Sequence, residues 1–285
     1  MIVVTGATGQ LGKLVIEALL GKVPVGQIVA AVRNPAKAAD LAAKGVQVRE
    51  ADYARPETLA TAFAGATRVL LISGSEIGQR IPQHKAVIDA AKAAGAGLLA
   101  YTSILHADTS PLLLAAEHLA TEQYLVASGL PYALLRNGWY TENYTVGLQN
   151  TLQHGVIFGA SGEGRIATAA RADYAVAAAA VLTGSGHENQ TYELAGDSAF
   201  TLTGFAAELS RQSGQSIRYQ NLTEAEFEKI LTGFLPPPIA HLLADSSARA
   251  AGNALDDSSH TLSRIIGHPT TPISETLAAA LAAIR

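Results

Sequence analysis

Three glycines near the start of the chain have the spacing of a turn that binds phosphate. Gly6, Gly9 and Gly12 lie between the β-branched run Ile2–Thr5 and the apolar run Leu14–Leu20. A strand that passes through glycines into a helix directs backbone N–H groups and the positive end of the helix dipole at one point, which suits a pyrophosphate. The spacing is G-x-x-G-x-x-G, a variant of the dinucleotide-binding fingerprint, and an ordinary strand-to-helix loop is the alternative.

Two basic residues lie at and just after the end of the second predicted strand, where the choice between NAD and NADP is made. An NAD-binding chain places a carboxylate about 20 residues after the glycines, on the ribose hydroxyls. This chain has Arg33 there, 21 residues after Gly12, with Lys37 one helical turn further on. A guanidinium binds a 2′-phosphate through two hydrogen bonds, whereas a carboxylate repels it. The pattern favours NADP. The alternative is that Arg33 and Lys37 are only solvated charges at the start of a helix.

Polar and small residues close the third, fourth and sixth predicted strands. Asp52 could accept a hydrogen bond from the adenine amino group, or it could cap the next helix. Ser73, Gly74 and Ser75 are small enough for a cofactor to approach the end of a strand. Asn137 could bind the carboxamide or a ribose hydroxyl. These residues would complete a dinucleotide site along one edge of a sheet.

An aromatic cluster follows Asn137 and could form a pocket for a flat acceptor. Trp139, Tyr140 and Tyr144 would stack on such a molecule, at about 0.5–1.5 kcal/mol for each ring pair. The alternative is that these rings pack the junction between two parts of the chain. Phe234, before the triple proline, is a further pocket candidate.

Strands that alternate with helices must position these residues. Through residue 136 the predicted strands are Ile2–Thr5, Gln27–Arg33, Val46–Glu50, Arg68–Ser73, Leu98–Thr102 and Tyr132–Arg136, with helices at about 10–20, 35–44, 56–64, 80–95 and 114–128. This alternation predicts an α/β fold, a doubly wound parallel (Rossmann) sheet with a smaller, mostly helical C-terminal cap. We expect an NADP-binding domain at 1–153, to which 173–195 return, and a substrate or cap domain at 154–285. In the second half we expect a helix near 173–183, strands near 191–195 and 217–221, and a turn or stiff spacer at Pro236–Pro238.

Composition restricts the classes of function. The 285 residues are 48% apolar and 15% charged, with a formal net charge of −4 and no basic run, which argues against nucleic acid and anionic membranes as partners. The chain has no Cys and no ligand spacing for a metal. The glycine turn begins at residue 6 and no apolar stretch reaches about 20 residues, so we expect a cytoplasmic protein without a membrane span. The sequence predicts no particular oligomeric state.

Four segments together resemble a known family. GATGQLG at the start, VRNPAK after the second strand, YTSILHAD after the fifth and LLRNGWYTENY after the sixth are similar to the NmrA-like branch of the atypical short-chain dehydrogenases. Within that branch the chain resembles the zinc-free bacterial NADPH:quinone oxidoreductases (type 2) and, more loosely, the triphenylmethane dye reductases. The resemblance extends over the whole chain, including Ile266–Thr271.

The resemblance implies an NADPH-dependent, two-electron reduction of quinones. It also implies that the cofactor is held by residues at the positions of the family motifs. These are Gly6, Ala7, Thr8, Gly9, Gln10, Leu11, Arg33, Ser73 to Ser75, Asn137, Gly138, Trp139, Tyr140, Thr141, Glu142 and Arg171.

The chain lacks the Tyr–Lys pair with which short-chain dehydrogenases protonate an alkoxide. Alignment with the family relatives places Leu114 at the Tyr position and His118 at the Lys position. A ketone benefits from such an acid, whereas a quinone gives a stabilised hydroquinone anion that water protonates. His118 and His106 are therefore weak candidates for proton donors. For His118 the alternative is a structural pair with Glu122, four residues on.

Two other functions fit the same sequence. An NADP-binding redox sensor without turnover would also lack the Tyr–Lys pair. A dye reductase would differ only in the shape of its pocket.

Overall fold

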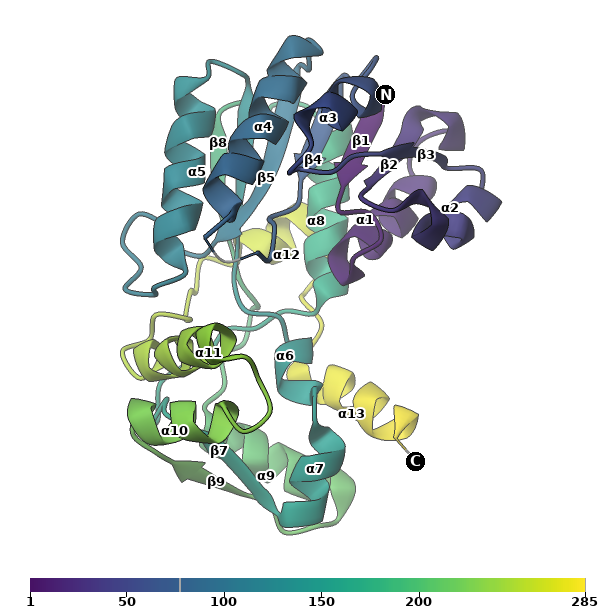
Figure 1. The fold of residues 1–285 in the computed structure, drawn as a ribbon. Coiled ribbons are helices and arrows are strands. Elements are labelled where there is room, and N and C mark those ends of the chain that lie inside the picture. Colours follow the sequence, from purple (N-terminus) through teal and green to yellow (C-terminus); the bar gives the residue numbers. More distant parts are fainter. Residues whose placement is uncertain (77, 285) are drawn as a thin grey trace. The chain divides into compact units, whose positions relative to one another are not determined.

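A parallel sheet of seven strands forms the centre of one part of the chain, in the order β3-β2-β1-β4-β5-β6-β8 (Figure 1). Its strands are β1 (Ile2–Thr5), β2 (Ile28–Val32), β3 (Gln47–Glu50), β4 (Arg68–Leu71), β5 (Leu98–Ile104), β6 (Tyr132–Asn137) and β8 (Gln190–Leu194). The order reverses between β1 and β4, and a doubly wound sheet binds its ligand at such a reversal. The predicted strands of the first half are confirmed to within two residues at each end.

The computed structural model describes residues 1–76 and 78–284, which divide into two compact units. The first unit comprises Met1–Ala107, Glu117–Asn137 and Arg171–Glu193, and contains the sheet. The second comprises Asp108–Ala116, Gly138–Ala170 and the chain from Leu194 onward. The domain boundary after residue 153 stays a prediction.

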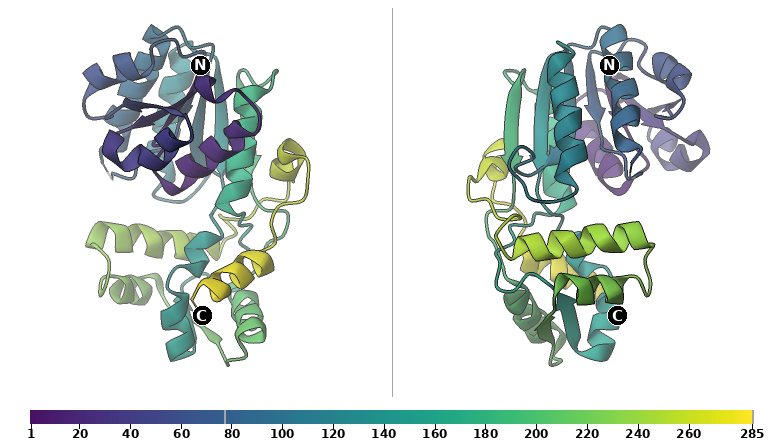
Figure 2. Two further views of the ribbon diagram at one scale, coloured as in Figure 1. Left: turned by 90° about the vertical axis from the view of Figure 1, so that its right-hand side faces the viewer. Right: turned by 60° about the vertical axis from the view of Figure 1, so that its left-hand side comes forward.

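Helices cover both faces of the sheet, which confirms the doubly wound class. On one face α1 packs against α8, and on the other α3, α4 and α5 cover a core that includes Leu59, Val87 and Leu125 (Figures 1 and 2). The helices of this unit are α1 (Gln10–Leu20), α2 (Ala39–Ala43), α3 (Pro56–Ala62), α4 (Arg80–Ala93), α5 (Ala115–Ala127) and α8 (Arg171–Thr183), with the 3₁₀ helices η1 (Val25–Gln27) and η2 (Pro35–Ala38). The first two residues of α5 belong to the second unit.

The second unit is mostly helical and has its own core. Its helices are α6 (Glu142–Thr145), α7 (Leu148–His154), α9 (Leu202–Ser213), α10 (Glu224–Leu231), α11 (Pro237–Ala250), α12 (Thr261–Ile266) and α13 (Ile273–Ala283). Phe205, Leu209 and Leu277 are buried together among them. A small parallel pair, β7 (Val156–Gly159) with β9 (Arg218–Asn221), completes the unit. The sequence predicted β9 but not β7, because Gly155 and Gly159 at its ends favoured a loop.

The prediction of a spacer at the three prolines is partly wrong. Pro236 is the N-cap of α11, and Pro237 and Pro238 are its first two residues. Proline is suited to this place because the first N–H groups of a helix have no partner within it. The run therefore opens a helix. None of the helices in the described residues is long and apolar enough to cross a membrane.

Candidate functional site

The glycine turn leaves the amino end of α1 free of side chains. Gly6 has a positive φ of 58°, and Gly9, the N-cap of α1, makes no side-chain cap and is exposed. By contrast, Thr201 and Thr223 cap α9 and α10 with their hydroxyls. No acidic residue lies in the first turn of α1. The N–H groups and the dipole at this end therefore lie open to an anion.

Gly12 allows the helix to pack directly on the turn. A Cβ on Gly12 would lie 2.4 Å from the Gly6 carbonyl oxygen and 2.7 Å from the Ala7 Cα. Both neighbours are backbone atoms, so neither can rotate away. The third glycine of the motif is thus required by packing, as its place in the motif predicted.

Arg33 and Lys37 lie near the carboxyl end of β2, the strand next to β1. Arg33 is exposed, and its Nη1 lies 2.8 Å from Glu76 Oε1 on the segment between β4 and α4. Lys37 is exposed in η2, whose N-cap is Asn34. The sequence did not predict a partner for Arg33.

Asp52 makes contacts within its own turn. Its Oδ1 accepts a hydrogen bond from the Ala54 N–H at 3.0 Å, and its Oδ2 lies 3.6 Å from Arg55 Nε. Both partners precede α3, so the contacts favour the turn-capping alternative over adenine binding. The neighbouring Tyr53 hydroxyl hydrogen-bonds Thr5 and the Ile72 carbonyl, at the ends of β1 and β4. Burial raises the pKa of Tyr53.

The segment Ser73–Ser75 is held by buried side chains. Ser73 N–H donates to Thr102 Oγ1 at 2.9 Å, and Gly74 N–H donates to His84 Nε2 at 2.9 Å. Gly74 oxygen accepts from Arg80 Nε at the same distance. The backbone of Ser73 and Gly74 is therefore fixed at the carboxyl end of β4, beside the point where the strand order reverses.

Two buried polar atoms at the ends of β5 and β6 have no hydrogen-bond partner in the structure. They are Asn137 Oδ1 and Ser103 Oγ, in residues that are only 6% and 5% exposed. Most buried polar atoms in proteins are hydrogen-bonded to protein, water or a ligand, so these two atoms are open to a bond with a water or a ligand. Asn137 was a predicted site residue. Ser103 was missed, although its place beside Thr102 at the end of a strand could have suggested it.

Arg136 is a structural residue of the first unit. Its guanidinium binds Glu122 through Nε and Nη2 at 3.0 and 2.7 Å, and Nη1 binds Glu193 at 2.8 Å. Burial opposes its charge, but the bonds to both carboxylates outweigh that effect and raise the pKa of Arg136. His106 joins the group through its backbone N–H, which donates to Glu193 Oε2 at 2.8 Å. The predicted pair between His118 and Glu122 does not form, since Glu122 binds Arg136.

His118 is buried and hydrogen-bonded to a tyrosine. Its Nδ1 lies 2.7 Å from the Tyr101 hydroxyl, and the residue is 4% exposed. Burial, with Arg80 and His84 nearby, holds the pKa of His118 well below its ordinary value. These contacts favour a structural role over proton donation. Leu114, at the position where an acid would lie, is in the turn before α5.

His84 is the second buried neutral histidine of this layer. Its Nε2 accepts from Gly74 N–H, so the ring proton lies on Nδ1, 3.1 Å from Thr121 Oγ1. Burial lowers the pKa of His84 to about 3, and Arg80 contributes. Its ring contacts the edge of the Tyr101 ring, with centroids 5.3 Å apart.

Acid should therefore destabilise the protein through these two histidines. In the unfolded chain each titrates near its ordinary pKa of 6.5, but in the folded protein each stays neutral until the pH is far lower. The unfolded state binds more protons below about pH 6.5, so stability is lost as the pH falls. Between about pH 7.5 and 5.5 each histidine should account for about 1 kcal/mol of unfolding free energy, measured by urea denaturation.

The matched comparison is His118→Gln against His268→Gln, an exposed residue. The first substitution should reduce the loss of stability over this pH range by about 1 kcal/mol, and the second should leave it unchanged. Equal pH dependence in the wild type and His118→Gln would show that His118 is not a buried neutral group.

The remaining predicted residues are divided between the two units. Arg171 is half-buried at the start of α8 in the first unit, whereas Gly138, Trp139, Tyr140, Thr141 and Glu142 belong to the second. Thr141 N–H donates to the Ala169 oxygen, and its hydroxyl to Thr168 Oγ1.

Two of the predicted pocket residues, Tyr144 and Phe234, have different surroundings in the second unit. Tyr144 packs edge-on against Phe200 at 5.3 Å, against the core of the second unit, so it packs within that unit, and the packing of a junction stays a prediction. Phe234, which follows α10, is 68% exposed. The structure therefore leaves Phe234, and not Tyr144, open to a ligand.

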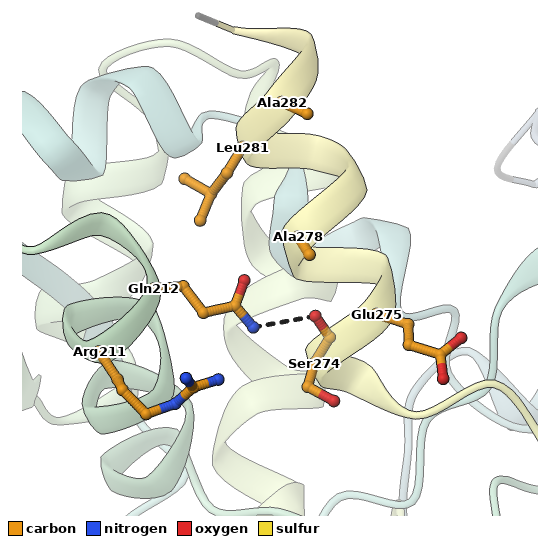
Figure 3. A pocket seen from close by; sticks show the side chains of 7 residues that line it. All are labelled: Arg211, Gln212, Ser274, Glu275, Ala278, Leu281 and Ala282. Atoms are coloured by element: carbon orange, nitrogen blue, oxygen red, sulfur yellow. Dashed lines mark hydrogen bonds between the residues drawn. The ribbon is translucent and has the colours of Figure 1, made fainter.

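A surface hollow of the second unit contains none of these residues. It lies between α9 and α13, lined by side chains that include Arg211, Gln212 and Leu281 (Figure 3). Gln212 Nε2 closes one side by donating to the Ser274 oxygen at 2.9 Å. Among the described residues, no group of three or more His, Cys, Asp or Glu could hold a metal ion.

Comparison with known proteins gives whole-length matches. A family described as NAD(P)H-binding matches residues 6–183. Quinone oxidoreductase 2 of Escherichia coli K12 is 58% identical over 278 residues, 97% of each chain. The crystal structure of E. coli NADPH-dependent quinone oxidoreductase QOR2 with NADPH covers 99% of this chain and 100% of its own, at a TM-score of 0.96 and 57% identity. The Citrobacter sp. triphenylmethane reductase with NADP(H) covers 98% and 100%, at a TM-score of 0.94 and 40% identity.

Proposed function

This chain belongs to the NAD(P)H-binding family, and we propose that it is an NADPH-dependent quinone oxidoreductase that transfers two electrons as a hydride. The observation that carries the proposal is the 58% identity with E. coli quinone oxidoreductase 2 over nearly the whole of both chains. A match of this extent spans both units of the chain.

The residues of the first unit fit the cofactor. The open amino end of α1 would bind the pyrophosphate through backbone N–H groups, and Gly6 gives the turn its left-handed conformation. Arg33 would hold the 2′-phosphate, with Lys37 as a second charge. Ser73, Gly74 and Ser75 would border the cofactor at the point where the strand order reverses.

The unpaired atoms of Asn137 and Ser103 support a ligand at the ends of β5 and β6. A carboxamide supplies both an N–H donor and a carbonyl acceptor, so it would pair with the Asn137 carbonyl and with a hydroxyl. This contact would fix the orientation of the nicotinamide ring.

Replacing Asn137 by Ala should separate cofactor binding from stability. Asn137 Oδ1 makes no hydrogen bond in the structure, so its removal should cost the free protein no more than about 1 kcal/mol. Loss of the proposed contact should weaken NADPH binding about tenfold. Thermal melts and fluorescence titration measure the two quantities. A lower melting temperature with unchanged NADPH affinity would assign Asn137 to the fold alone.

The chemistry places few demands on the side chains. Bound NADPH supplies a hydride equivalent to the quinone ring, and the product is a hydroquinone anion. The ring stabilises that anion, so water can provide the proton. His118 is buried, neutral and bonded to Tyr101, which agrees with a site without a dedicated acid. The protein's main contribution is to position the two reactants.

The acceptor site is proposed to involve Tyr140 and Phe234. Phe234 is exposed and could cover a flat ring, while the backbone of Tyr140 is fixed by its bridge to Ala169. Trp139, Gly138, Thr141 and Glu142 remain proposed cofactor contacts, as does Arg171. We also assign the reaction to the cytoplasm, where NADPH is regenerated.

Dye reduction is a second candidate activity. It is favoured by the 40% identity with the triphenylmethane reductase and by 30% identity, over 96% of each chain, with the NAD(P)H azoreductase of Xenophilus azovorans. Steady-state oxidation of NADPH with benzoquinones and with a triphenylmethane dye, side by side, tests both. We expect the quinones to be the better acceptors. Turnover of the dye alone would replace the first proposal by the second.

A further inference from the structure

Glu76 is a negative charge placed beside the residue that selects NADPH. Its Oε1 lies 2.8 Å from Arg33 Nη1, and both side chains are largely exposed, at 50% and 71%. Most exposed ion pairs are weak because both side chains move freely. This pair differs, since Glu76 is held by a second contact.

Gln83 fixes the other oxygen of the Glu76 carboxylate. Gln83 Nε2 donates to Glu76 Oε2 at 2.7 Å, and Gln83 is only 8% exposed in the first half of α4. The carboxylate therefore has one oxygen on a buried amide and one on the guanidinium. In this series of contacts, from Gln83 to Glu76 to Arg33, Arg33 is the most exposed residue.

The backbone on both sides of Glu76 is also held from within the unit. His84 and Arg80 bind the N–H and the oxygen of Gly74, and Glu117 Oε1 accepts from the Gly78 N–H at 3.1 Å. Arg80 in turn binds Glu117 at 2.6 Å, with 6% of its own side chain exposed. Glu76 thus has a defined position set by α4 and α5.

A 2′-phosphate on Arg33 must then share the guanidinium with Glu76. The phosphate carries negative charge, so the carboxylate repels it and competes for the same donors. NADH has a hydroxyl at that place and meets no such repulsion. The geometry points to Glu76 as a competing counter-ion for Arg33, a residue that weakens NADPH binding and so sets the degree of preference over NADH. This inference rests on the proposed binding of the 2′-phosphate by Arg33.

The test is the affinity of Glu76→Gln for NADPH and for NADH, measured by fluorescence titration of the whole protein without quinone. Removing the charge should tighten NADPH binding about fivefold, and NADH binding should not change. The gain should shrink at high salt, which screens exposed charges. In an Arg33→Met background the same substitution should have a smaller effect on NADPH, because only the direct repulsion between carboxylate and phosphate is then removed.

Glu188→Gln is the matched control, because it removes an exposed carboxylate of the same unit beside β8, at the other edge of the sheet from β2 and β3. It should change neither affinity. Unchanged or weaker NADPH binding in Glu76→Gln would overturn the inference, as would an equal gain for NADH. A wild-type protein that fails to bind NADPH would overturn the proposed function and this inference with it.

Discussion

Arg33→Glu should lower the affinity for NADPH at least about 100-fold and change that for NADH little. The guanidinium would give the 2′-phosphate charge-assisted hydrogen bonds worth about 1.5–3 kcal/mol each, and a carboxylate replaces them by repulsion. Arg33 is exposed and its side chain pairs with the exposed Glu76, so the fold should tolerate the change. The measurement is a pair of binding titrations, with NADPH and with NADH.

Arg218→Glu is the control for net charge, because Arg218 is an exposed residue of β9 in the second unit. It should leave both affinities as they are. Equal losses for NADPH and NADH in Arg33→Glu would contradict the role at the 2′-phosphate and would indicate general damage to the site.

Gly12→Ala should damage the fold and the cofactor site together. The added Cβ would lie 2.4 Å from the Gly6 oxygen and 2.7 Å from the Ala7 Cα, so α1 must move away from the turn. Overpacking of this kind costs about 1–3 kcal/mol, and the shifted N–H groups would bind the pyrophosphate more than about tenfold less tightly. Urea unfolding and NADPH titration measure the two effects.

Gly21→Ala is the same substitution at the other end of α1. There the nearest atom to a new Cβ is the Ala18 oxygen at 4.0 Å, and φ is −79°. We expect unchanged affinity and a stability that is equal or up to about 1 kcal/mol higher. If Gly12→Ala were as benign as Gly21→Ala, close packing of helix on turn would not be the reason for the third glycine.

The sequence predicts the fold of the first unit well because its signals are local. β-branched runs alternate with helical patterns, and the helical runs end at Gly45, Gly65, Gly95 and Gly129, all with positive φ in the structure. The glycine turn likewise lies within a few residues of its strand and helix. Such signals do not depend on the rest of the chain.

The contacts of individual site residues are harder to predict because their partners are distant in the sequence. Arg33 binds Glu76, and Arg136 binds Glu193, across gaps of 43 and 57 residues. The four-residue spacing of His118 and Glu122 predicted a pair, but each found a closer partner on the sheet, Tyr101 and Arg136. Helical spacing alone therefore did not decide the pairing. The roles of the cofactor residues stay predictions for the binding experiments.

A single-turnover experiment tests the central claim most directly. The protein loaded with one equivalent of NADPH is mixed rapidly with a benzoquinone, and NADPH absorbance is followed beside the yield of hydroquinone. We predict loss of one NADPH for each hydroquinone formed, faster than in the same mixture without protein. Tight NADPH binding without accelerated oxidation would contradict the claim, and is the result that a redox sensor would give.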